Sequence, residues 1–334
     1  MSETAEVVQA HGRLPSVSVV VPAYNEAPIL LWSMQTLHEH MHTLDDRYDW
    51  ELVVVDDGST DETGEIADLF ASRHDRTRVL HHPRNYNLGQ ALRYGFGSCT
   101  GDYIVTMDCD LSYSPDHIER MLDHLRTTRA KIVIASPYLR GGTTENVPAF
   151  RRWVSRVANR FLSFSVKGDL STLTSMVRAY DRKFVASLNL KAMDIEVNTE
   201  ILYKARILRA SVEEIPGHLR WGGHPGLVDR QRSSSIRVGR STAAYIFNGF
   251  LFRPVLLFVL PGVLLFLACI GLVIAGAGGD HPAALVGAAV CLVLATQLIS
   301  LGILCLQAKR YFEELFHLGT NVLRGTRSEW RSSS

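Results

Sequence analysis

The chain has 334 residues, enough for two or three structural units, and its formal net charge at pH 7 is +1. A nearly neutral chain has no overall affinity for polyanions, so the composition predicts no nucleic acid as a partner. The five cysteines form no C-x-x-C pair, which argues against a zinc site or a disulfide framework and favours a reducing, cytoplasmic compartment for the polar part of the chain.

Short apolar runs alternate with helical patterns through residue 136. Strands are predicted at residues 16–22, 51–56, 78–81, 103–107 and 131–136. The helix after the first strand is expected to bury Leu30, Leu31, Met34, Leu37 and Met41. The helix after the second follows a capping-box spacing, Ser59 to Glu62, and is expected to bury Ile66, Leu69 and Phe70. This alternation implies right-handed βαβ units, so the expected fold class is α/β with a mostly parallel, Rossmann-like sheet.

Two carboxylates, Asp108 and Asp110, follow the apolar run that ends at Met107. Alternate side chains of a strand share a face, so both are expected to point into the same small volume. Two like charges that close repel each other unless a cation lies between them, and Mg²⁺ takes oxygen ligands from one or two carboxylates plus substrate phosphates. The pair therefore predicts a divalent metal site. An acidic strand end that faces water is the alternative.

More polar side chains fall at the ends of the other predicted strands. They are Tyr24, Asn25, Glu26, Asp56 and Asp57. Ligands of parallel sheets bind at the carboxyl ends of the strands, which is where these residues and the Asp-x-Asp pair converge. This convergence favours a binding site over acids that serve only solubility.

Two long uncharged runs, residues 255–276 and 283–306, occupy the last third of the chain. At 1.5 Å per residue, each is long enough to cross about 30 Å of hydrocarbon. Basic residues flank the pair: Arg237, Arg240 and Arg253 before it, Lys309 and Arg310 after it. The positive-inside rule then predicts a hairpin in the cell (inner) membrane, with the polar domain and both termini in the cytoplasm. A buried hairpin of a soluble protein is the alternative.

The segments beside this hairpin mix basic and apolar residues. Both 231–253 and 309–334 are predicted to contain interfacial helices with a basic side toward anionic lipid, although ordinary packing against the polar domain would give the same pattern. The expected organisation is a polar tail (1–15), a catalytic α/β domain (16–230), a basic interfacial region (231–253), a membrane hairpin (254–308) and a C-terminal interfacial helix and tail (309–334).

Four stretches together resemble glycosyltransferase family two, the inverting enzymes of GT-A fold. They are Val20–Glu26, Val53–Asp61, Asn87–Ala91 and Met107–Leu111. Within that family the chain is similar to the polyprenyl-phosphate glycosyltransferases, the group that contains dolichol-phosphate mannose synthase. This narrower likeness rests on Ala135–Tyr138 with Gly141 and Gly142, on the helix expected from Arg152 to Phe161, and on Thr174–Tyr180 and Glu214–Pro216.

The resemblance implies transfer of one sugar, with inversion, from a UDP- or GDP-linked donor to a polyprenyl phosphate at the cytoplasmic face of the bilayer, with Mg²⁺ or Mn²⁺ as cofactor. It implies that Asp108 and Asp110 hold the metal and, with Arg178, are catalytic. The nucleotide-sugar site would comprise Pro22, Tyr24, Glu26, Val55, Asp56, Asp57 and Cys109. The acceptor phosphate would be held by Ser136, Arg178, Arg230, Arg232 and Arg237.

The chain departs from the group's pattern at two basic positions. An Arg expected after Ser136 is Pro137, and a Lys expected after Ser235 is Ile236, so Arg232 or Arg237 is expected to supply the missing charge. A polyprenyl monophosphate has a second pKa of about 6 and is largely ionised at neutral pH, so it needs no general base. These departures leave the sugar and the nucleotide open.

Two other functions fit parts of the sequence. A processive polysaccharide synthase has a Gln-x-x-Arg-Trp motif that Arg220-Trp221 resembles, but Gly217 stands at the Gln position. A non-catalytic membrane scaffold that binds nucleotide sugars would not need the Asp-x-Asp pair. A two-span anchor also makes a homo-oligomer a reasonable expectation.

Overall fold

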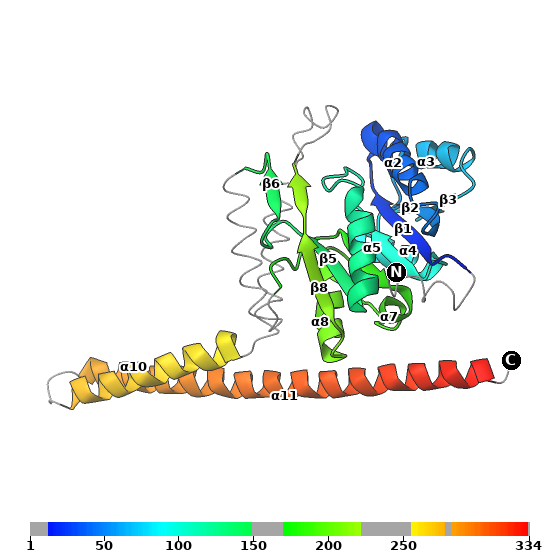
Figure 1. The fold of residues 1–334 in the computed structure, drawn as a ribbon. Coiled ribbons are helices and arrows are strands. Elements are labelled where there is room, and N and C mark those ends of the chain that lie inside the picture. The colour runs from blue at the N-terminus through cyan, green and yellow to red at the C-terminus, as the bar shows by residue number, and fades with distance from the viewer. Residues whose placement is uncertain (1–12, 149–169, 222–254, 278–281, 333–334) are drawn as a thin grey trace. The chain divides into compact units, whose positions relative to one another are not determined.

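The computed structural model describes residues 13–148, 170–221, 255–277 and 282–332. The chain divides into two compact units, Met1–Arg237 and Val238–Ser334 (Figure 1). Each unit is described by itself. The predicted helix at 152–161 and the basic region at 231–253 lie outside the described residues, as do Arg230, Arg232 and Arg237.

The first unit is built on a seven-stranded sheet of order β3-β2-β1-β4-β7-β5-β8. The strands are β1 Ser16–Ala23, β2 Asp49–Asp56, β3 Thr77–His81, β4 Tyr103–Thr106, β5 Ile132–Ser136, β7 Arg178–Asp181 and β8 Val212–Pro216. Strand β7 is antiparallel to both of its neighbours, and every other pair in this sheet is parallel. The expected α/β class with a mostly parallel sheet is confirmed.

Helices connect these strands (Figure 1). They are α2 Ala27–His42, α3 Thr63–Ala71, α4 Leu88–Ser98, α5 Asp116–Thr128, α7 Arg182–Ala186 and α8 Val197–Ile207. The predicted apolar face of α2 is buried except for Leu31, which is 47% exposed, and in α3 Leu69 is 55% exposed. Both predictions of burial were wrong because each leucine lies next to a buried residue, Leu30 or Phe70, and one residue turns a helix by about 100°.

A small parallel sheet of β6 Thr143–Glu145 and β9 His218–Arg220 lies beside the carboxyl end of β8. It is joined to the loop after β4 by a bridge between Tyr113 and Leu219 and by the Arg220 N–H, which donates to the Ser112 carbonyl at 2.8 Å. The loop that follows the Asp-x-Asp pair is therefore anchored to the last strand of the domain.

The second unit is a helical hairpin. A π-helical turn η2 Val255–Val259 leads into α10 Leu260–Gly276, which packs against α11 Pro282–Ser332. The helices approach closely where they have glycine: a Cβ on Gly262 would lie 2.7 Å from Ile299 Cγ1, and one on Gly302 would lie 2.6 Å from Val259 Cγ2. Small residues allow this approach in the packing of apolar helices.

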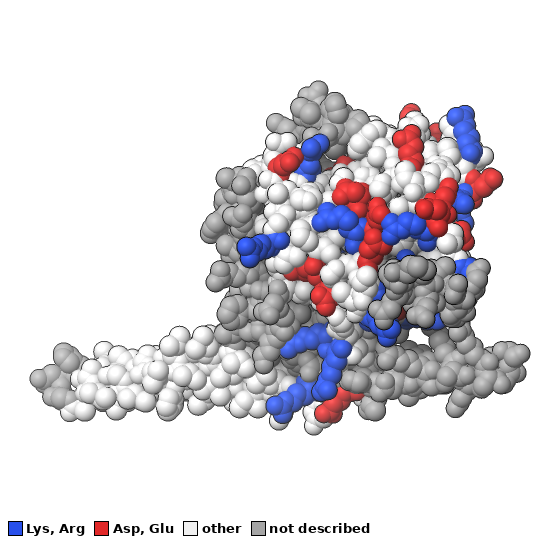
Figure 2. Space-filling model, viewed as in Figure 1, with Lys and Arg blue, Asp and Glu red and all other residues white. Residues whose placement is uncertain are grey.

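The hairpin is long and apolar enough to cross a bilayer, by length and composition, at Leu257–Gly276 and Pro282–Ala308. Many of its large apolar side chains are exposed, among them Leu264, Ile274, Val286 and Leu304, and the same stretch is free of charged side chains in Figure 2. Burial inside this unit therefore does not account for its apolar composition. Helix α11 continues without a break past residue 308, so the predicted boundary at 308–309 lies within one helix.

The C-terminal half of α2 carries a cluster of rings around His38. Its ring centroid lies 4.5 Å from that of His42, 4.4 Å from that of His74 and 5.2 Å from that of Trp50. Burial, and then the positive charges of His74, His42 and Arg76, lower the pKa of His38 to about 4, although Asp45 acts in the opposite direction. His38 is therefore uncharged in the folded protein near neutral pH.

The His38 ring is expected to make unfolding pH-dependent between about pH 4 and 6.5. In that window the unfolded chain binds a proton that the folded chain does not, so the unfolding free energy rises with pH. Discounted for partial exposure, we expect His38 to contribute a rise of about 1–2 kcal/mol between pH 5 and 7, and His38→Phe to remove that contribution while those of His40 and His117, whose pKa values burial also lowers, remain. Urea unfolding followed by far-ultraviolet circular dichroism measures it. His218→Phe, at an exposed site outside the cluster, should retain the rise; an unchanged slope in His38→Phe would contradict the assignment.

Candidate active site

Strands β1, β2, β3 and β4 end at one edge of the sheet. The parallel register pairs Ala23 with Asp56 and Asp56 with His81. Main-chain hydrogen bonds continue past the strand ends, from Asp57 N to the Ala23 carbonyl at 2.9 Å and from His82 N to the Asp56 carbonyl at 2.9 Å. The residues that follow each strand are therefore held next to one another.

The two acids after β2 are buried and paired with two histidines. Asp57 Oδ1 accepts from His82 Nδ1 at 2.7 Å and from Tyr86 N at 3.0 Å. Asp56 Oδ1 accepts from Ser59 N at 3.0 Å, and its Oδ2 accepts from His81 Nδ1 at 3.0 Å. These bonds hold both carboxylates in fixed orientations at the sheet edge.

His81 and His82 were not among the residues predicted for the site. The signal was available, because these residues come directly at and after the end of β3 as Asp56 and Asp57 do for β2. Burial alone would lower the pKa of His81, but its hydrogen bonds with Asp56 and Asp68 and the charges of those acids outweigh burial and raise it. An acid at this edge thus favours a charged histidine beside it.

The loop after β1 is tied to the loop after β2. Asn25, at φ 54°, donates its N–H to Ser59 Oγ at 3.0 Å, and its Oδ1 accepts from Thr60 N at 2.8 Å. The Glu26 N–H donates to Thr63 Oγ1 at 2.8 Å. The predicted capping box did not form: Glu62 is the N-cap residue of α3 without a side-chain cap, and Ser59 bonds across to the other loop instead.

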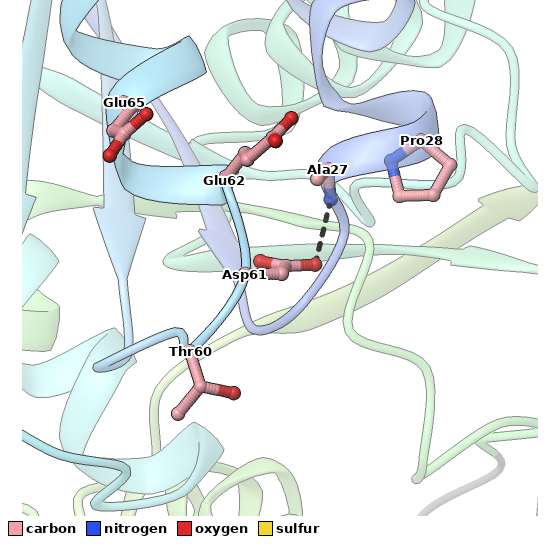
Figure 3. A pocket seen from close by; sticks show the side chains of 6 residues that line it. All are labelled: Ala27, Pro28, Thr60, Asp61, Glu62 and Glu65. Atoms are coloured by element: carbon pink, nitrogen blue, oxygen red, sulfur yellow. Dashed lines mark hydrogen bonds between the residues drawn. The ribbon is translucent and has the colours of Figure 1, made fainter.

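A pocket of about 560 Å³ opens between these two loops (Figure 3). It is lined by Ala27, Pro28, Thr60, Asp61, Glu62 and Glu65, and Asp61 Oδ2 accepts from the Ala27 N–H at 3.4 Å. Three carboxylates and no basic side chain make its lining negative, which disfavours a diphosphate. The sheet edge beside it, not this pocket, carries the candidate site.

Gly58 allows the close approach of the loops after β2 and β3. Its φ is +67°, and a Cβ there would lie 2.2 Å from the main-chain carbonyl carbon of Arg84. We expect Gly58→Ala to lower the unfolding free energy by at least about 2 kcal/mol, because it adds a steric overlap to a left-handed backbone. Thermal unfolding measures this. Gly97→Ala is the matched control, since nothing lies within 4 Å of a Cβ at this helical position; equal melting temperatures for the two variants would contradict the prediction.

Asp108 and Asp110 lie in a turn, not in a strand. Strand β4 ends at Thr106, and the Leu111 N–H donates to the Asp108 carbonyl at 3.1 Å, with Leu111 at φ 45°. The predicted alternation of strand side chains was therefore the wrong reason for placing the two acids together. Asp110 Oδ1 accepts from Ser112 N at 3.0 Å and from Ser112 Oγ at 2.6 Å, which fixes its carboxylate.

The pKa of the Cys109 thiol reflects the negative charges around this turn. Burial raises its pKa, and the negative charges of Glu26, Asp110 and Asp108 raise it further. Acids from the ends of β1 and β4 therefore act on one point, and a cation there would relieve their repulsion. Carboxylate oxygens are the ligands that Mg²⁺ and Mn²⁺ prefer.

The described residues contain no group of three or more His, Cys, Asp or Glu side chains that could hold a metal by themselves. Asp108 and Asp110 fit a hard cation only if other ligands, such as substrate phosphates or water, complete the coordination. That is the usual arrangement for a nucleotide-bound divalent ion.

Arg178, which was predicted to contact the acceptor phosphate, is a buried side chain. It is 0% exposed, and it donates to the carbonyls of Ser175 at 2.7 Å, Asn198 at 2.8 Å and Leu173 at 2.7 Å. Ser136 is also fully buried, with its Oγ 2.7 Å from Ser171 Oγ. Both side chains therefore belong to the interior, and their polar atoms contact protein groups; their predicted role at the acceptor phosphate stays a prediction.

Five of the residues predicted for nucleotide binding differ in how far they are exposed. The side chains of Val55 and Cys109 are in the core, so a ligand would meet only their main chain. Tyr24 is exposed and Glu26 half-buried, as surface binding residues should be. Pro22, half-buried, lies opposite Val55 in the β1–β2 register.

Comparison with known families identifies this arrangement. The profile described as Glycosyl transferase family 2 matches residues 18–188, more than half of the chain. The chain belongs to glycosyl transferase family 2. The match contains every strand end that carries the candidate site, so the acids after β1, β2 and β4 are within this transferase's family domain.

Relatives of this family 2 transferase include a "Polyprenol monophosphomannose synthase" of Mycolicibacterium smegmatis, 32% identical over 59% of this chain and 75% of the relative. A "Dolichol-phosphate mannosyltransferase" of Pyrococcus furiosus is 29% identical over 60% of this chain and 55% of the relative.

Solved structures of the same fold include glucosyl-3-phosphoglycerate synthase from Mycobacterium tuberculosis, crystallised with Mn²⁺, uridine-diphosphate and phosphoglyceric acid. Its TM-score is 0.53 at 21% identity, over 74% of this chain and 80% of that chain. The GT-A-like fold expected for the family 2 transferase is confirmed.

Proposed function

We propose that this family 2 transferase moves one sugar, with inversion, from a nucleotide-diphosphate sugar to a polyprenyl phosphate. The observation that carries the proposal is that one chain combines a carboxylate-rich sheet edge with a long, exposed apolar hairpin. The first suits a nucleotide with its metal, and the second suits an acceptor that resides in a bilayer. The printed names of two relatives, which refer to polyprenol and dolichol phosphate, support the same acceptor class.

The donor would lie along the ends of β1, β2 and β4. Asp57 would hold the nucleobase, Tyr24 and Glu26 would line the nucleotide site, and Asp108 and Asp110 would hold Mg²⁺ or Mn²⁺ against the diphosphate. A divalent ion there stabilises the negative charge that develops on the departing nucleoside diphosphate. The bond from Ser112 to Asp110 keeps that carboxylate in place.

The acceptor phosphate would react without a base. One of its oxygens forms the new bond to the anomeric carbon as the bond from that carbon to the nucleoside diphosphate breaks, and attack from the opposite face inverts the configuration. A phosphate monoester is already ionised near neutral pH. Because Arg178 is buried, the arginines proposed to hold this phosphate are Arg230, Arg232 and Arg237, which lie outside the described residues.

The apolar hairpin is proposed to span the membrane, with the catalytic domain and both termini in the cytoplasm. The basic residues that flank it favour this orientation. A chain that ends at residue 253 is expected to move from the membrane fraction to the supernatant on alkaline washing, whereas the full chain stays with the membrane. Immunoblotting of the two fractions measures this. A truncated chain that stays with the membrane would show that residues 231–253 suffice as an anchor.

The test of the function is a transfer assay with radiolabelled nucleotide sugars and the full-length protein in vesicles that contain polyprenyl phosphate, with Mg²⁺, with Mn²⁺ or with a chelator. We expect a labelled, solvent-extractable lipid that depends on metal and is absent when polyprenol replaces its phosphate. A labelled polymer would favour a processive synthase. Sugar binding without turnover would favour a non-catalytic scaffold.

A further inference from the structure

One carboxylate oxygen of Asp57 accepts hydrogen bonds from the protein, and the other accepts none from the described residues. The side chain is only 6% exposed. Its Oδ1 accepts two hydrogen bonds, at 2.7 Å from His82 and at 3.0 Å from Tyr86 N, which uses both lone pairs of that oxygen. Within the described parts of the chain, no hydrogen bond reaches Oδ2. The Oδ2 atom keeps some access to solvent, so it is open to a ligand N–H, and a hydrogen bond to an ionised carboxylate is stronger than one between neutral groups.

His82 is held so that it keeps Oδ1 occupied. Its ring stacks on Tyr94, with centroids 5.1 Å apart and planes 14° apart, and meets Tyr86 edge-on at 5.1 Å. The His82 side chain is only 12% exposed. Because rings on two sides restrict it, the Nδ1–H stays directed at Asp57, and a ligand cannot easily displace it.

From this geometry we infer that the donor nucleotide is a uridine diphosphate. The inference rests on the proposed function, in which Asp57 holds the base. Uracil presents one N–H, at N3, which matches one available oxygen. Guanine presents N1–H and N2–H side by side, and a carboxylate satisfies both only with two available oxygens. Adenine and cytosine direct a ring-nitrogen acceptor at the carboxylate next to their single amino donor, which is repulsive. His82 is thus a positioning residue for base choice.

The experiment is calorimetric titration of the full-length protein in detergent with UDP, GDP, CDP and ADP, each with Mn²⁺. We expect UDP to bind at least about ten-fold more tightly than each of the others, because each loses a charge-assisted hydrogen bond to Oδ2 or gains repulsion. GDP binding as tightly as UDP would overturn the inference and leave the transfer proposal standing. Failure of all four to bind would overturn both.

Variants test the role of His82. His82→Phe keeps an aromatic ring against Tyr94 but removes the Nδ1 donor, so it releases one lone pair of Asp57 Oδ1. We expect the UDP-to-GDP affinity ratio to fall at least about five-fold, chiefly because GDP binds better. His124→Phe, the same change on α5, should keep the ratio of the natural chain. An unchanged ratio in folded His82→Phe would remove His82 from base choice, and if that variant does not fold, the ranking of the four nucleotides with the natural chain still decides the inference.

Discussion

Asp110→Asn is expected to reduce sugar transfer by at least about a hundred-fold while the protein stays folded. The change removes one negative charge from the proposed metal site, and loss of one preorganised electrostatic contact to a developing charge costs about 10²–10³ in rate. Folding should survive because asparagine keeps an oxygen that can accept the hydrogen bonds from Ser112. Initial rates with saturating donor, together with a thermal unfolding curve, measure both effects.

The matched control is Asp46→Asn, the same chemical change at an exposed site outside the sheet edge. It should transfer sugar at the natural rate. Turnover by Asp110→Asn within a few-fold of that rate would show that Asp110 does not hold a catalytic cation. Excess Mn²⁺ is a further probe, since a weakened metal site should recover part of its activity as the metal concentration rises.

Arg178→Met is expected to lower the unfolding free energy by about 3–5 kcal/mol. Methionine approximates the length of the arginine stem but removes the charged donor from the hydrogen bonds to the carbonyls of Leu173, Ser175 and Asn198, two of which are buried. Those carbonyls lie on the segment that enters β7 and on α8, so the change loosens contact between two parts of the domain. Denaturant unfolding of the full chain measures this loss, which should appear with or without substrate.

This prediction separates the two roles considered for Arg178. A phosphate-binding arginine, when replaced, would leave stability intact and raise the KM for the lipid acceptor. Replacement of a structural arginine lowers the unfolding free energy, and activity then falls only in proportion to the folded fraction. Arg73→Met, at an exposed position just after α3, is the control and should change the unfolding free energy by less than about 0.5 kcal/mol. A stable Arg178→Met with a raised KM would restore the phosphate-binding role.

The sequence alone predicts the strand ends because β1, β2 and β4 are short apolar runs that stop at polar residues. The two carboxylate pairs follow from those stops, since parallel strands bring their carboxyl ends to one edge. His81, the last residue of β3, and His82 give a weaker signal, because that strand is short and only partly buried. The convergence of parallel strand ends nevertheless applies to β3 as it does to β2.

Arg178 could not be placed from the sequence for a different reason. Arginine is rarely fully buried, and its charge suits a phosphate, so an accessible side chain was expected at this position. Its burial follows from β7, which enters between β4 and β5 from a point more than forty residues beyond β5. Local pattern contains no information about such an insertion, nor about the carbonyls that happen to surround the guanidinium.

The position of β7 also determines the order in which the parts of the sheet can form during synthesis on the ribosome. Strands β3, β2, β1 and β4 are consecutive in the sheet. All four have been synthesised by residue 106, so this part of the sheet can assemble early. Strand β5 emerges next but has no place beside β4 until residues 178–181 arrive to fill the gap. The nascent chain therefore carries the open edge of β4 through the synthesis of residues 107–177, an interval in which a chaperone that shields exposed strands would matter most for this protein.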